Sequence, residues 1–392
     1  MRTLCLLFAA ALLAAACADR DIAGISADRF KAESGDPEDP DGPGLTVMTY
    51  NVYYGTDPTP LLTTPLDQVP VVAAEVWALA QHTDFPARAG ALAEQIASRR
   101  PHLVGLQEAA LYRVQQSGDA AFGGTTPATA VVYDFLALLV DSLEARGLHY
   151  VVAAADSTTD VELPAFTGID GAGNPTFDDV RLTDRDAVLA RADVQFANAR
   201  HGTYQTFIPV SFGPVQTGVF EGWASVDATV RGRTFRFVST HLEAQLAVPV
   251  QVGQAQELLG LLQSETRPTI LVGDFNSDVL GNVPGAATPA YGMITGAGFA
   301  DSWLRPHRPD PGATCCESAD LGNPQPTLNQ RIDFVFTRNL PRFVVPLRRE
   351  VVGDLAGNRT PGGLWPSDHA GLVTSFVWPP MGPWREWADV AE

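Results

Sequence analysis

Eight polar side chains in six short motifs could carry chemistry in this 392-residue chain. They are carboxylates, amides and imidazoles that stand at or just after apolar runs: Asn51, Glu108, His241, Asp274, Asn276, Asp333, Asp368 and His369. Carboxylate and amide oxygens are the ligands that Mg²⁺ prefers, and aspartate or histidine can accept or donate a proton. These residue types therefore suit metal binding combined with proton transfer.

Taken singly, most of these residues also have an ordinary structural explanation. Glu108 could be a solvated residue after a strand, and the Gly-Asp-Phe-Asn sequence at 273–276 could form a tight turn. The Ser-Asp-His sequence at 367–369 could cap a helix, and His241 could be a core histidine with a satisfied hydrogen bond. Asp333 is a stronger signal, because an ionised carboxylate inside an apolar run is costly unless it is paired.

Taken in order along the chain, the motifs resemble those of the endonuclease/exonuclease/phosphatase superfamily. This superfamily includes deoxyribonucleases, abasic-site endonucleases, neutral sphingomyelinases and inositol-polyphosphate phosphatases. The matching segments are Thr49-Tyr50-Asn51-Val52, Val104-Gly105-Leu106-Gln107-Glu108, Ser239-Thr240-His241-Leu242, Gly273-Asp274-Phe275-Asn276, Arg331-Ile332-Asp333-Phe334-Val335 and Ser367-Asp368-His369. The resemblance implies an α/β (α+β) fold, a four-layer sandwich of two packed, mostly antiparallel mixed β-sheets flanked by helices.

The resemblance also implies a metal site. Glu108 is expected to be the main ligand of Mg²⁺, for which Mn²⁺ could substitute. Asn51 is expected beside the metal and the scissile phosphate, and Asp368 is expected to be able to join the site. An oxygen-donor set of this kind suits a hard divalent cation.

The remaining matched residues are expected to act on the substrate. Asp274 and Asn276 are expected to hold the nucleophilic water and the phosphate oxygens. His369 is expected next to the scissile phosphate, with Asp333 fixing its ring and raising its pKa. Either Asp274 or His369 could be the general base.

His241 narrows the choice of branch. A histidine in the Thr-His-Leu motif is similar to deoxyribonucleases and sphingomyelinases and differs from abasic-site endonucleases. The deoxyribonuclease branch pairs this histidine with a glutamate, but Ala154 stands at the matching point in this chain. Three nearby aspartates are possible replacements: Asp156, Asp184 and Asp186.

The N-terminus is typical of an exported protein. Arg2 precedes an apolar run over residues 4–16, which is too short to cross a bilayer and is typical of a signal peptide. The run ends in Leu13-Ala14-Ala15-Ala16-Cys17, which resembles a bacterial lipobox with alanine in place of leucine at position 14. We expect Cys17 to be lipidated; the alternative is an ordinary secretory signal with an incidental cysteine.

The expected domain organisation follows from this interpretation. Residues 1–16 form the signal peptide, and residues 17–44, which are acidic and poor in large apolar side chains, form a disordered tether. Residues 45–392 form one catalytic domain. The protein is expected to be a monomer in the cell envelope, lipid-anchored at the outer membrane or the cell surface.

Charge and cysteine content limit the alternatives. The formal net charge is −19, which does not favour a broad cationic surface for nucleic acid, so a metal cation is expected to handle a phosphate group. Cys315 and Cys316 are adjacent, which does not fit the spacing of a structural zinc site. They could form a vicinal disulfide or remain as thiols beside the site.

Apolar periodicity predicts alternating strands and helices. Strands are expected at 45–52, 103–106, 150–154, 187–190, 219–230, 234–240, 269–272, 332–336 and 372–376, and helices at 88–100, 133–146 and around 252–262. A polar, glycine-containing segment between the strands at 150–154 and 187–190 is expected to be a long loop.

The function expected from these observations is an envelope-anchored phosphodiesterase that acts on nucleic acid or on a phospholipid headgroup. A phosphomonoesterase acting on a small phosphorylated compound is the alternative, and a binding module without catalysis is a third interpretation. The segments 113–130 and 155–185 should discriminate between substrates. A groove there would fit a polymer, whereas a pocket or an apolar collar would fit a headgroup or a lipid.

Overall fold

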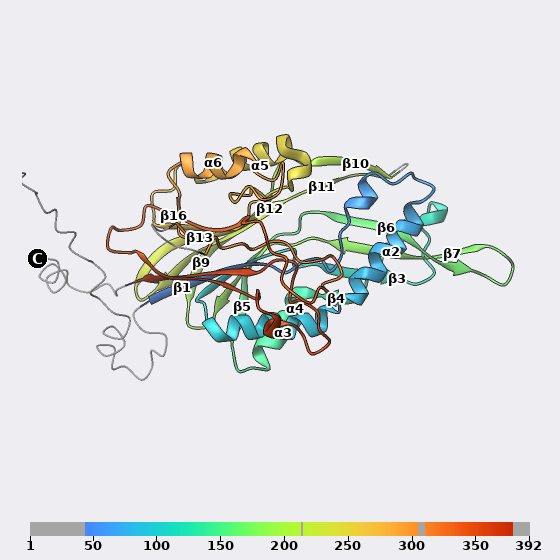
Figure 1. Ribbon diagram of the computed structural model, residues 1–392. Helices are drawn as coiled ribbons and strands as arrows, with labels where there is room; N and C mark the ends of the chain where they lie inside the picture. The colour runs from blue at the N-terminus through green and yellow to red at the C-terminus, as the bar shows by residue number, and fades with distance from the viewer. Residues whose placement is uncertain (1–43, 213–214, 305–309, 379–392) are drawn as a thin grey trace, which may run out of the picture. The chain divides into compact units, whose positions relative to one another are not determined.

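The computed structural model describes residues 44–212, 215–304 and 310–378 (Figure 1). Cys17, the expected signal peptide and all of the expected tether except Gly44 lie outside the described residues. Among the helices of the described part, none combines the length and the apolar character needed to cross a membrane.

Two six-stranded mixed sheets form the centre of the fold. Their strand orders are β17–β18–β1–β2–β8–β5 and β15–β16–β14–β13–β12–β9. The first sheet contains β1 (Gly44–Asn51), β2 (Leu103–Gln107), β5 (Tyr150–Ala155), β8 (Ala187–Arg191), β17 (Pro346–Val352) and β18 (Gly371–Val377). The second contains β9 (Gln195–Thr203), β12 (Gly222–Val230), β13 (Arg233–His241), β14 (Thr269–Asp274), β15 (Ala300–Asp301) and β16 (Asp333–Arg338). The pairs β1–β2 and β13–β14 are parallel and the other pairs in these sheets are antiparallel.

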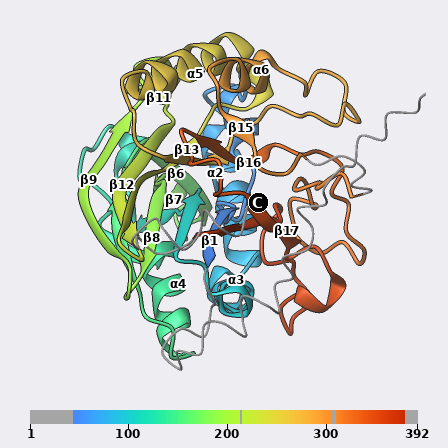
Figure 2. The ribbon, with the colours of Figure 1, turned by 90° about the vertical axis from the view of Figure 1, so that its left-hand side faces the viewer.

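Alternation of side chains along β1 shows how the layers are held together. Leu45 and Val47 belong to the apolar core shared with residues of the second sheet, whereas Met48 and Tyr50 point to the opposite face, where they pack with residues of two helices. Those helices are α3 (Phe85–Arg99) and α4 (Phe135–Glu144), and α5 (Val248–Leu262) and α6 (Pro289–Gly296) cover the second sheet. Figure 2 shows the helix pairs on opposite sides of the two sheets. The expected four-layer sandwich is confirmed.

Helix α3 illustrates how local sequence sets an element. Asp84 caps its N-terminus by accepting a hydrogen bond from the Ala87 N–H at 3.3 Å, and Arg100 ends it in a left-handed conformation. The predicted apolar stripe, which includes Leu92 and Ile96, is buried against the first sheet.

A further sheet and a hairpin extend this sandwich. The sheet has the order β4–β3–β7–β6, and helix α2 packs on β6 through Val69, Ala73, Leu163 and Ala165. The bounds are β3 (Leu111–Gln115), β4 (Ala130–Asp134), β6 (Asp160–Ile169), β7 (Pro175–Thr183) and α2 (Val69–His82). Strands β10 (Ile208–Phe212) and β11 (Val215–Val219) form the hairpin. Both lie on the right-hand side of Figure 1.

The prediction of a long loop between β5 and β8 is wrong, because this segment contains the β6–β7 hairpin. Val161, Leu163 and Ala165 alternate along β6, but Pro164 interrupts the pattern of strand-forming residues. Proline is tolerated there because β6 is the edge strand of its sheet.

Candidate active site

The ends of five central strands place the side chains of the candidate site. Asn51 ends β1, Glu108 follows β2, His241 ends β13, Asp274 ends β14 and Asp333 begins β16. In the second sheet, His241 pairs with Asp274 in the parallel ladder, and Asp274 pairs with Asp333 in the antiparallel ladder. Strand register alone therefore sets three of these residues side by side.

Close contact between the two sheets joins the two sets of strand ends. A Cβ atom on Gly105 would lie 2.5 Å from Val272 Cγ2, so only glycine allows this approach. Nearby, Gln107 Nε2 donates a hydrogen bond to Ser239 Oγ at 2.9 Å, which links β2 to β13. The residues that follow these strands are thus held at one end of the sandwich.

Asn51 connects the two sheets within the site. Its Nδ2 donates to Glu108 Oε1 at 2.8 Å and lies 3.2 Å from Asp274 Oδ2. The other oxygen of Glu108 accepts the Tyr54 N–H at 2.9 Å. The carboxylate of Glu108 is consequently fixed in orientation before any ligand binds.

Unusual backbone conformations aim two of the side chains. Glu108 and Asn276 have φ values of 58° and 47°, in the left-handed region that most residues avoid. Gly273 has a φ of 149°, and a Cβ there would lie 1.9 Å from the Thr240 carbonyl oxygen. The Gly-Asp-Phe-Asn sequence is therefore required by backbone geometry as well as by its side chains.

His369 lies between two of the carboxylates. Its Nδ1 is 2.9 Å from Asp333 Oδ2, and its Nε2 is 3.7 Å from Asp274 Oδ2. Burial alone would lower the pKa of His369, but Asp333, Asp274 and Asp368 together raise it well above its ordinary value. The three carboxylates therefore favour the protonated form of the ring. Burial and the neighbouring Asp333 raise the pKa of Asp274 to about 7.

His241 has a different environment and a different partner from those expected. Its Nε2 lies 3.1 Å from Asn276 Nδ2, and its Nδ1 lies 3.3 Å from Glu221 Oε2. Burial and the nearby His369 lower the pKa of His241 to about 3, so this ring is neutral. Burial first, then Asp184, raises the pKa of Glu221 well above its ordinary value, so both partners favour their uncharged forms.

The acidic partner of His241 is therefore Glu221, and not one of the three aspartates that the sequence offered as replacements. Asp156 instead accepts the backbone N–H of Asp186 at 2.6 Å, and Asp184 accepts the Thr158 hydroxyl at 2.6 Å. Glu221 stands just before β12, in a stretch expected to be one continuous strand. A glutamate inside a predicted apolar strand could have identified Glu221 as a candidate site residue, by the same argument that identified Asp333.

Residues 48–369 match the model of one protein family, the endonuclease/exonuclease/phosphatase family. The chain belongs to this family. The expectation drawn from the motifs is thereby confirmed. No curated protein is significantly similar to the chain.

Solved structures with a similar fold include three relatives of low identity. The endonuclease/exonuclease/phosphatase from Beutenbergia cavernae DSM 12333 is 22% identical, with a TM-score of 0.50 over 85% of this chain and 71% of that one. A family protein from Leptotrichia buccalis C-1013-b is 17% identical, with a TM-score of 0.46 over 85% and 99%. D. rerio TDP2, solved with a single-strand DNA product, is 16% identical, with a TM-score of 0.46 over 85% and 98%.

As in other endonuclease/exonuclease/phosphatase family members, the site suits a divalent cation. Burial, and then the neighbouring Asp368, raise the pKa of Glu108 to about 8, so the two carboxylates repel each other. The donors are oxygens, which fit Mg²⁺ or Mn²⁺. Asp274, Asp333 and His369 also offer ligand atoms within 4.8 Å of one another.

Buried Arg88 balances the negative charge of the site only in part: it lowers the pKa of Asp368, but burial outweighs this effect and the pKa remains raised. Its guanidinium donates to the carbonyl oxygens of Val52, Tyr53 and Pro366 at 2.8, 3.1 and 3.0 Å, and also to that of Thr83 at 2.9 Å. These bonds tie the loop after β1 to the segment before Asp368. Arg88 thus positions the two loops and is not directed at a substrate.

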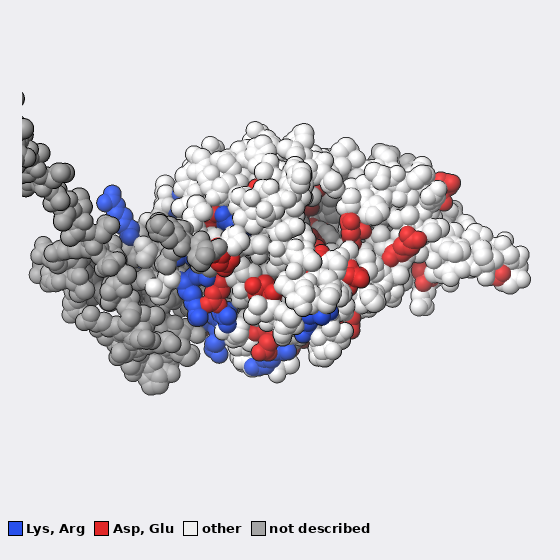
Figure 3. Space-filling view, in the orientation of Figure 1, with Lys and Arg blue, Asp and Glu red and all other residues white. Residues whose placement is uncertain are grey.

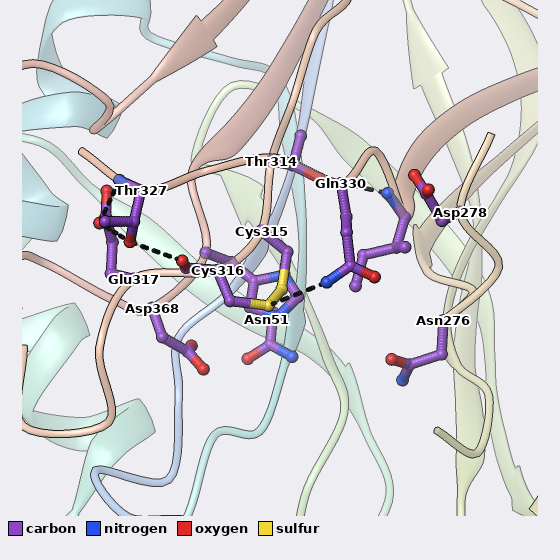
Figure 4. Close-up of a disulfide and its surroundings, with 12 residues drawn as sticks. Asn51, Asn276, Asp278, Thr314, Cys315, Cys316, Glu317, Thr327, Gln330 and Asp368 are labelled. Atoms are coloured by element: carbon purple, nitrogen blue, oxygen red, sulfur yellow. Dashed lines mark hydrogen bonds between the residues drawn. A yellow bond between two sulfur atoms is a disulfide. The ribbon is translucent and has the colours of Figure 1, made fainter. Parts of the chain in front are cut away.

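Cys315 and Cys316 form a disulfide, one of the two states that the sequence left open. Cys315 makes isolated β-bridges to Gln330 and to His369, so it supports the segment that carries the histidine. Figure 4 shows the disulfide between Gln330 and Asp368, close to Asn51.

The site opens into one cavity of about 370 Å³. Glu108, His241, Asp274, Asn276, Asp368 and His369 all line one part of it. The remainder is lined by many apolar side chains together with threonines and further carboxylates, and none of the lining residues that the structure describes is Lys or Arg. Figure 3 shows acidic side chains beside a hollow in the face of the molecule.

Proposed function

We propose that this protein is a divalent-metal-dependent phosphodiesterase. One observation carries the proposal: the Asp333–His369 pair, the carboxylates of Glu108, Asp274 and Asp368, and the amide of Asn276 come together beside a single cavity. Together with membership of a family that includes metal-dependent phosphoester hydrolases, this arrangement supports in-line attack of water on phosphorus.

Each side chain has a task that its geometry supports. Asp333 orients the ring of His369 and favours its protonated form, which can donate a proton to the departing oxygen. Asp274, whose pKa is about 7, can accept a proton from the attacking water. Asn51 holds the Glu108 carboxylate beside Asp274, and Asn276, whose Nδ2 donates to the Leu242 carbonyl oxygen at 2.9 Å, positions the ring of His241.

Glu108 and Asp368, with Asn51 beside them, would hold the metal. Mg²⁺ or Mn²⁺ bound there would neutralise charge on the phosphate oxygens and acidify a water molecule. Asn51, Tyr54 and His369 offset the repulsion between the two carboxylates only in part, and this, with the absence of Lys or Arg from the described cavity lining, supports the assignment.

The charge of the cavity favours a diester over a monoester. A phosphomonoester carries about −1.5 to −2 charges at neutral pH, whereas a diester carries a single charge. The described lining of the cavity contains carboxylates but no Lys or Arg, so it accommodates the single negative charge of a diester better than the larger charge of a monoester. The phosphomonoesterase alternative is therefore disfavoured.

The same feature argues against a nucleic-acid polymer as substrate. Proteins that hold a nucleic-acid strand neutralise several phosphates with Lys and Arg. Without such residues in the described lining, binding depends on the single phosphate at the site. A small phosphodiester of the phospholipid-headgroup type fits the cavity better.

We also propose that the enzyme acts at the cell envelope. This proposal is supported by the apolar run of residues 4–16, by Cys17 directly after three alanines, and by the acidic segment that precedes the domain.

The test compares bis-p-nitrophenyl phosphate with p-nitrophenyl phosphate, using purified protein. We expect the diester to be hydrolysed at least about tenfold faster, EDTA to abolish the activity, and added Mg²⁺ or Mn²⁺ to restore it. Glu108→Gln should lower kcat by about 10²-fold at saturating Mg²⁺. Faster hydrolysis of the monoester, or full activity after extensive EDTA treatment, would contradict the proposal.

Glu108→Gln needs a folding control. Because burial and Asp368 already raise the pKa of Glu108, a neutral glutamine should not destabilise the metal-free protein. Its melting temperature in EDTA should therefore equal or exceed that of the wild type.

A further inference from the structure

We propose that the part of the cavity away from the catalytic residues binds an alkyl chain attached to the scissile phosphate. This part, the apolar chamber, is defined by the ten apolar side chains Leu61, Leu62, Val161, Leu163, Leu182, Ile208, Val210, Phe212, Val219 and Leu246, and the hydroxyl-bearing Thr59, Thr159 and Thr217 line the cavity on or next to the same segments. The substrate is then an amphiphilic phosphodiester. The inference rests on the proposed function for the phosphate end and adds the class of substituent.

The chamber is assembled by segments outside the two sheets of the sandwich. They are the 3₁₀ turn η2 (Thr59–Leu62), β6, β7, the β10–β11 hairpin and the 3₁₀ turn η4 (Gln245–Ala247). Leu163 lies in the apolar cluster between β6 and helix α2, and Phe212 packs against the same cluster. The chamber wall is therefore backed by a small core of its own.

A pair of hydrogen bonds fixes the chamber to the catalytic end. The Thr159 hydroxyl donates to the Phe220 carbonyl oxygen at 3.0 Å, and the Phe220 N–H donates to the same hydroxyl at 2.7 Å. Thr159 lines the cavity at the start of β6, and Glu221, the neighbour of Phe220, lies 3.3 Å from His241. A molecule that begins at the catalytic residues thus continues directly into the chamber.

The chemistry of the wall favours a hydrocarbon chain over a nucleoside. Nucleobases bind by stacking on aromatic rings and by pairing of their polar edges, and a buried sugar needs a partner for each hydroxyl. Of the ten chamber residues, nine are aliphatic and only Phe212 is aromatic; the other aromatic lining residues, Tyr53 and Tyr54, belong to the catalytic end, where their N–H groups bind Asn51 and Glu108. Such a surface gains free energy from apolar contact and provides few groups that could satisfy a polar substituent.

The size and rim of the chamber also fit a chain. The whole cavity, at about 370 Å³, lies near the lower end of small-molecule sites, so it accommodates one chain segment and not a polymer. Leu62 and Leu246 line the cavity while remaining 38% and 70% exposed. Apolar side chains therefore continue to the mouth, where a longer chain would leave the cavity.

A series of alkyl p-nitrophenyl phosphates, from methyl to octyl, tests the chamber below micelle-forming concentrations. Burial of one methylene should raise kcat/KM about fourfold, until the chamber is full and the values level off. Values of kcat/KM that do not change with chain length would overturn the inference.

Val210→Asp separates the chamber from the catalytic end. Val210 is half-buried on the hairpin, so the substitution should leave the melting temperature close to that of the wild type, and the comparison is the ratio of kcat/KM between long and short esters within each protein. The substitution should abolish most of the gain with chain length. Val131→Asp is the matched control, because Val131 is 59% exposed on β4 and does not line the cavity. An equal gain in wild type and Val210→Asp would overturn the inference.

Binding keeps the two proposals distinguishable. Calorimetry with methyl and hexyl esters of methylphosphonic acid, in the presence of Mg²⁺, reports on the chamber without turnover. Suppose that no ester of the chromogenic series is hydrolysed, but the hexyl phosphonate binds more tightly than the methyl phosphonate, and Val210→Asp removes this difference. The chamber is then supported and the proposed function is rejected. Equal affinities would reject the chamber.

A final arm distinguishes single molecules from a lipid surface as the source of the chain. Phosphatidylcholine vesicles should lower the rate with the octyl ester, because they compete with the chamber for the free molecule. Hydrolysis of the octyl ester that occurs only when vesicles are present would overturn the inference that the chamber binds single molecules from solution.

Discussion

The two ends of the cavity are built by different parts of the molecule. At the catalytic end, carboxylates, amides and histidines follow the central strands of the sandwich, where strand register determines their neighbours. At the other end, apolar side chains come from 3₁₀ turns, an edge sheet and a hairpin. Because the two sets of elements are separate, the chemistry of the site and its choice of substrate can change independently.

The largest effect should come from the pair formed by His369 and Asp333. His369→Ala should lower kcat by about 10²-fold or more for every substituent on the phosphate, because a proton donor at the reacting atoms is lost. Asp333→Asn should also lower kcat, since it removes the charge that orients and protonates the ring. Steady-state kinetics on the methyl and hexyl esters measures both effects.

The double mutant then shows whether the pair acts as one unit. We expect the combined loss to be far smaller than the product of the two single losses. Thermal melts of all three variants control for unfolding. A kcat near that of the wild type for His369→Ala, or fully multiplicative losses, would show that this pair is not the proton-transfer device.

A smaller effect is expected at Glu221, where the two ends of the cavity meet. Because burial and Asp184 favour the uncharged form of its carboxyl, which faces His241, Glu221→Gln should keep kcat within about threefold, whereas Glu221→Ala should lower it about tenfold. The measurement is kcat at saturating Mg²⁺ for both variants. An equal loss in both would mean that Glu221 acts as a charged group.

The pH dependence of stability provides an independent check on the same residue. The pKa of Glu221 is raised in the folded state, so above the ordinary glutamate pKa the folded protein retains a proton that the unfolded chain releases. This group therefore destabilises the fold increasingly as the pH rises from about 4 towards the folded-state pKa. In EDTA, Glu221→Gln should melt at a higher temperature than wild type at pH 8 and at nearly the same temperature at pH 4. A difference independent of pH would contradict the neutral state.

The same division explains what the sequence could predict. Strands β1, β2 and β14 are buried along their length and form apolar runs, so both they and the polar residues that end them stand out. The β6–β7 hairpin presents an apolar face on one side only, and Pro164 weakens its pattern. Its partner surface, helix α2, was not predicted either, so nothing local identified the chamber.

Glu221 shows the same limit within the catalytic end. It stands twenty residues before His241, at a corner between β11 and β12, and only the pairing of β12 with β13 brings it into contact. Propensity and motif spacing contain no information about that corner. The disulfide, in contrast, was one of two stated possibilities, and its location beside Asp368 follows from the bridge to His369.

The Cys315–Cys316 bridge should matter less than any residue that lines the site. Because the two cysteines are adjacent, the bridge closes almost no loop, and its entropic contribution to stability is small. The Cys315→Ser, Cys316→Ser double mutant should keep kcat within about threefold, with a small decrease in melting temperature. A large loss of activity in a folded double mutant would assign the sulfurs a direct part in the reaction.

The smallest effect on the reaction itself is expected from Cys17→Ser. The substituted residue precedes the first strand of the domain, so kcat for the monomeric methyl ester should remain within about twofold of the wild type. The location of the enzyme should change, since each buried methylene of a lipid anchor contributes about 0.8 kcal/mol to membrane binding. After cell fractionation, the variant should be found in the soluble fraction. The wild type should be enriched in the outer membrane, because Ala18 and not aspartate follows the cysteine. Equal membrane retention of the two proteins would reject the anchor.

Purified Cys17→Ser should still show the full rise in kcat/KM from the methyl to the octyl ester, because the chamber and the lipid anchor are separate parts of the protein.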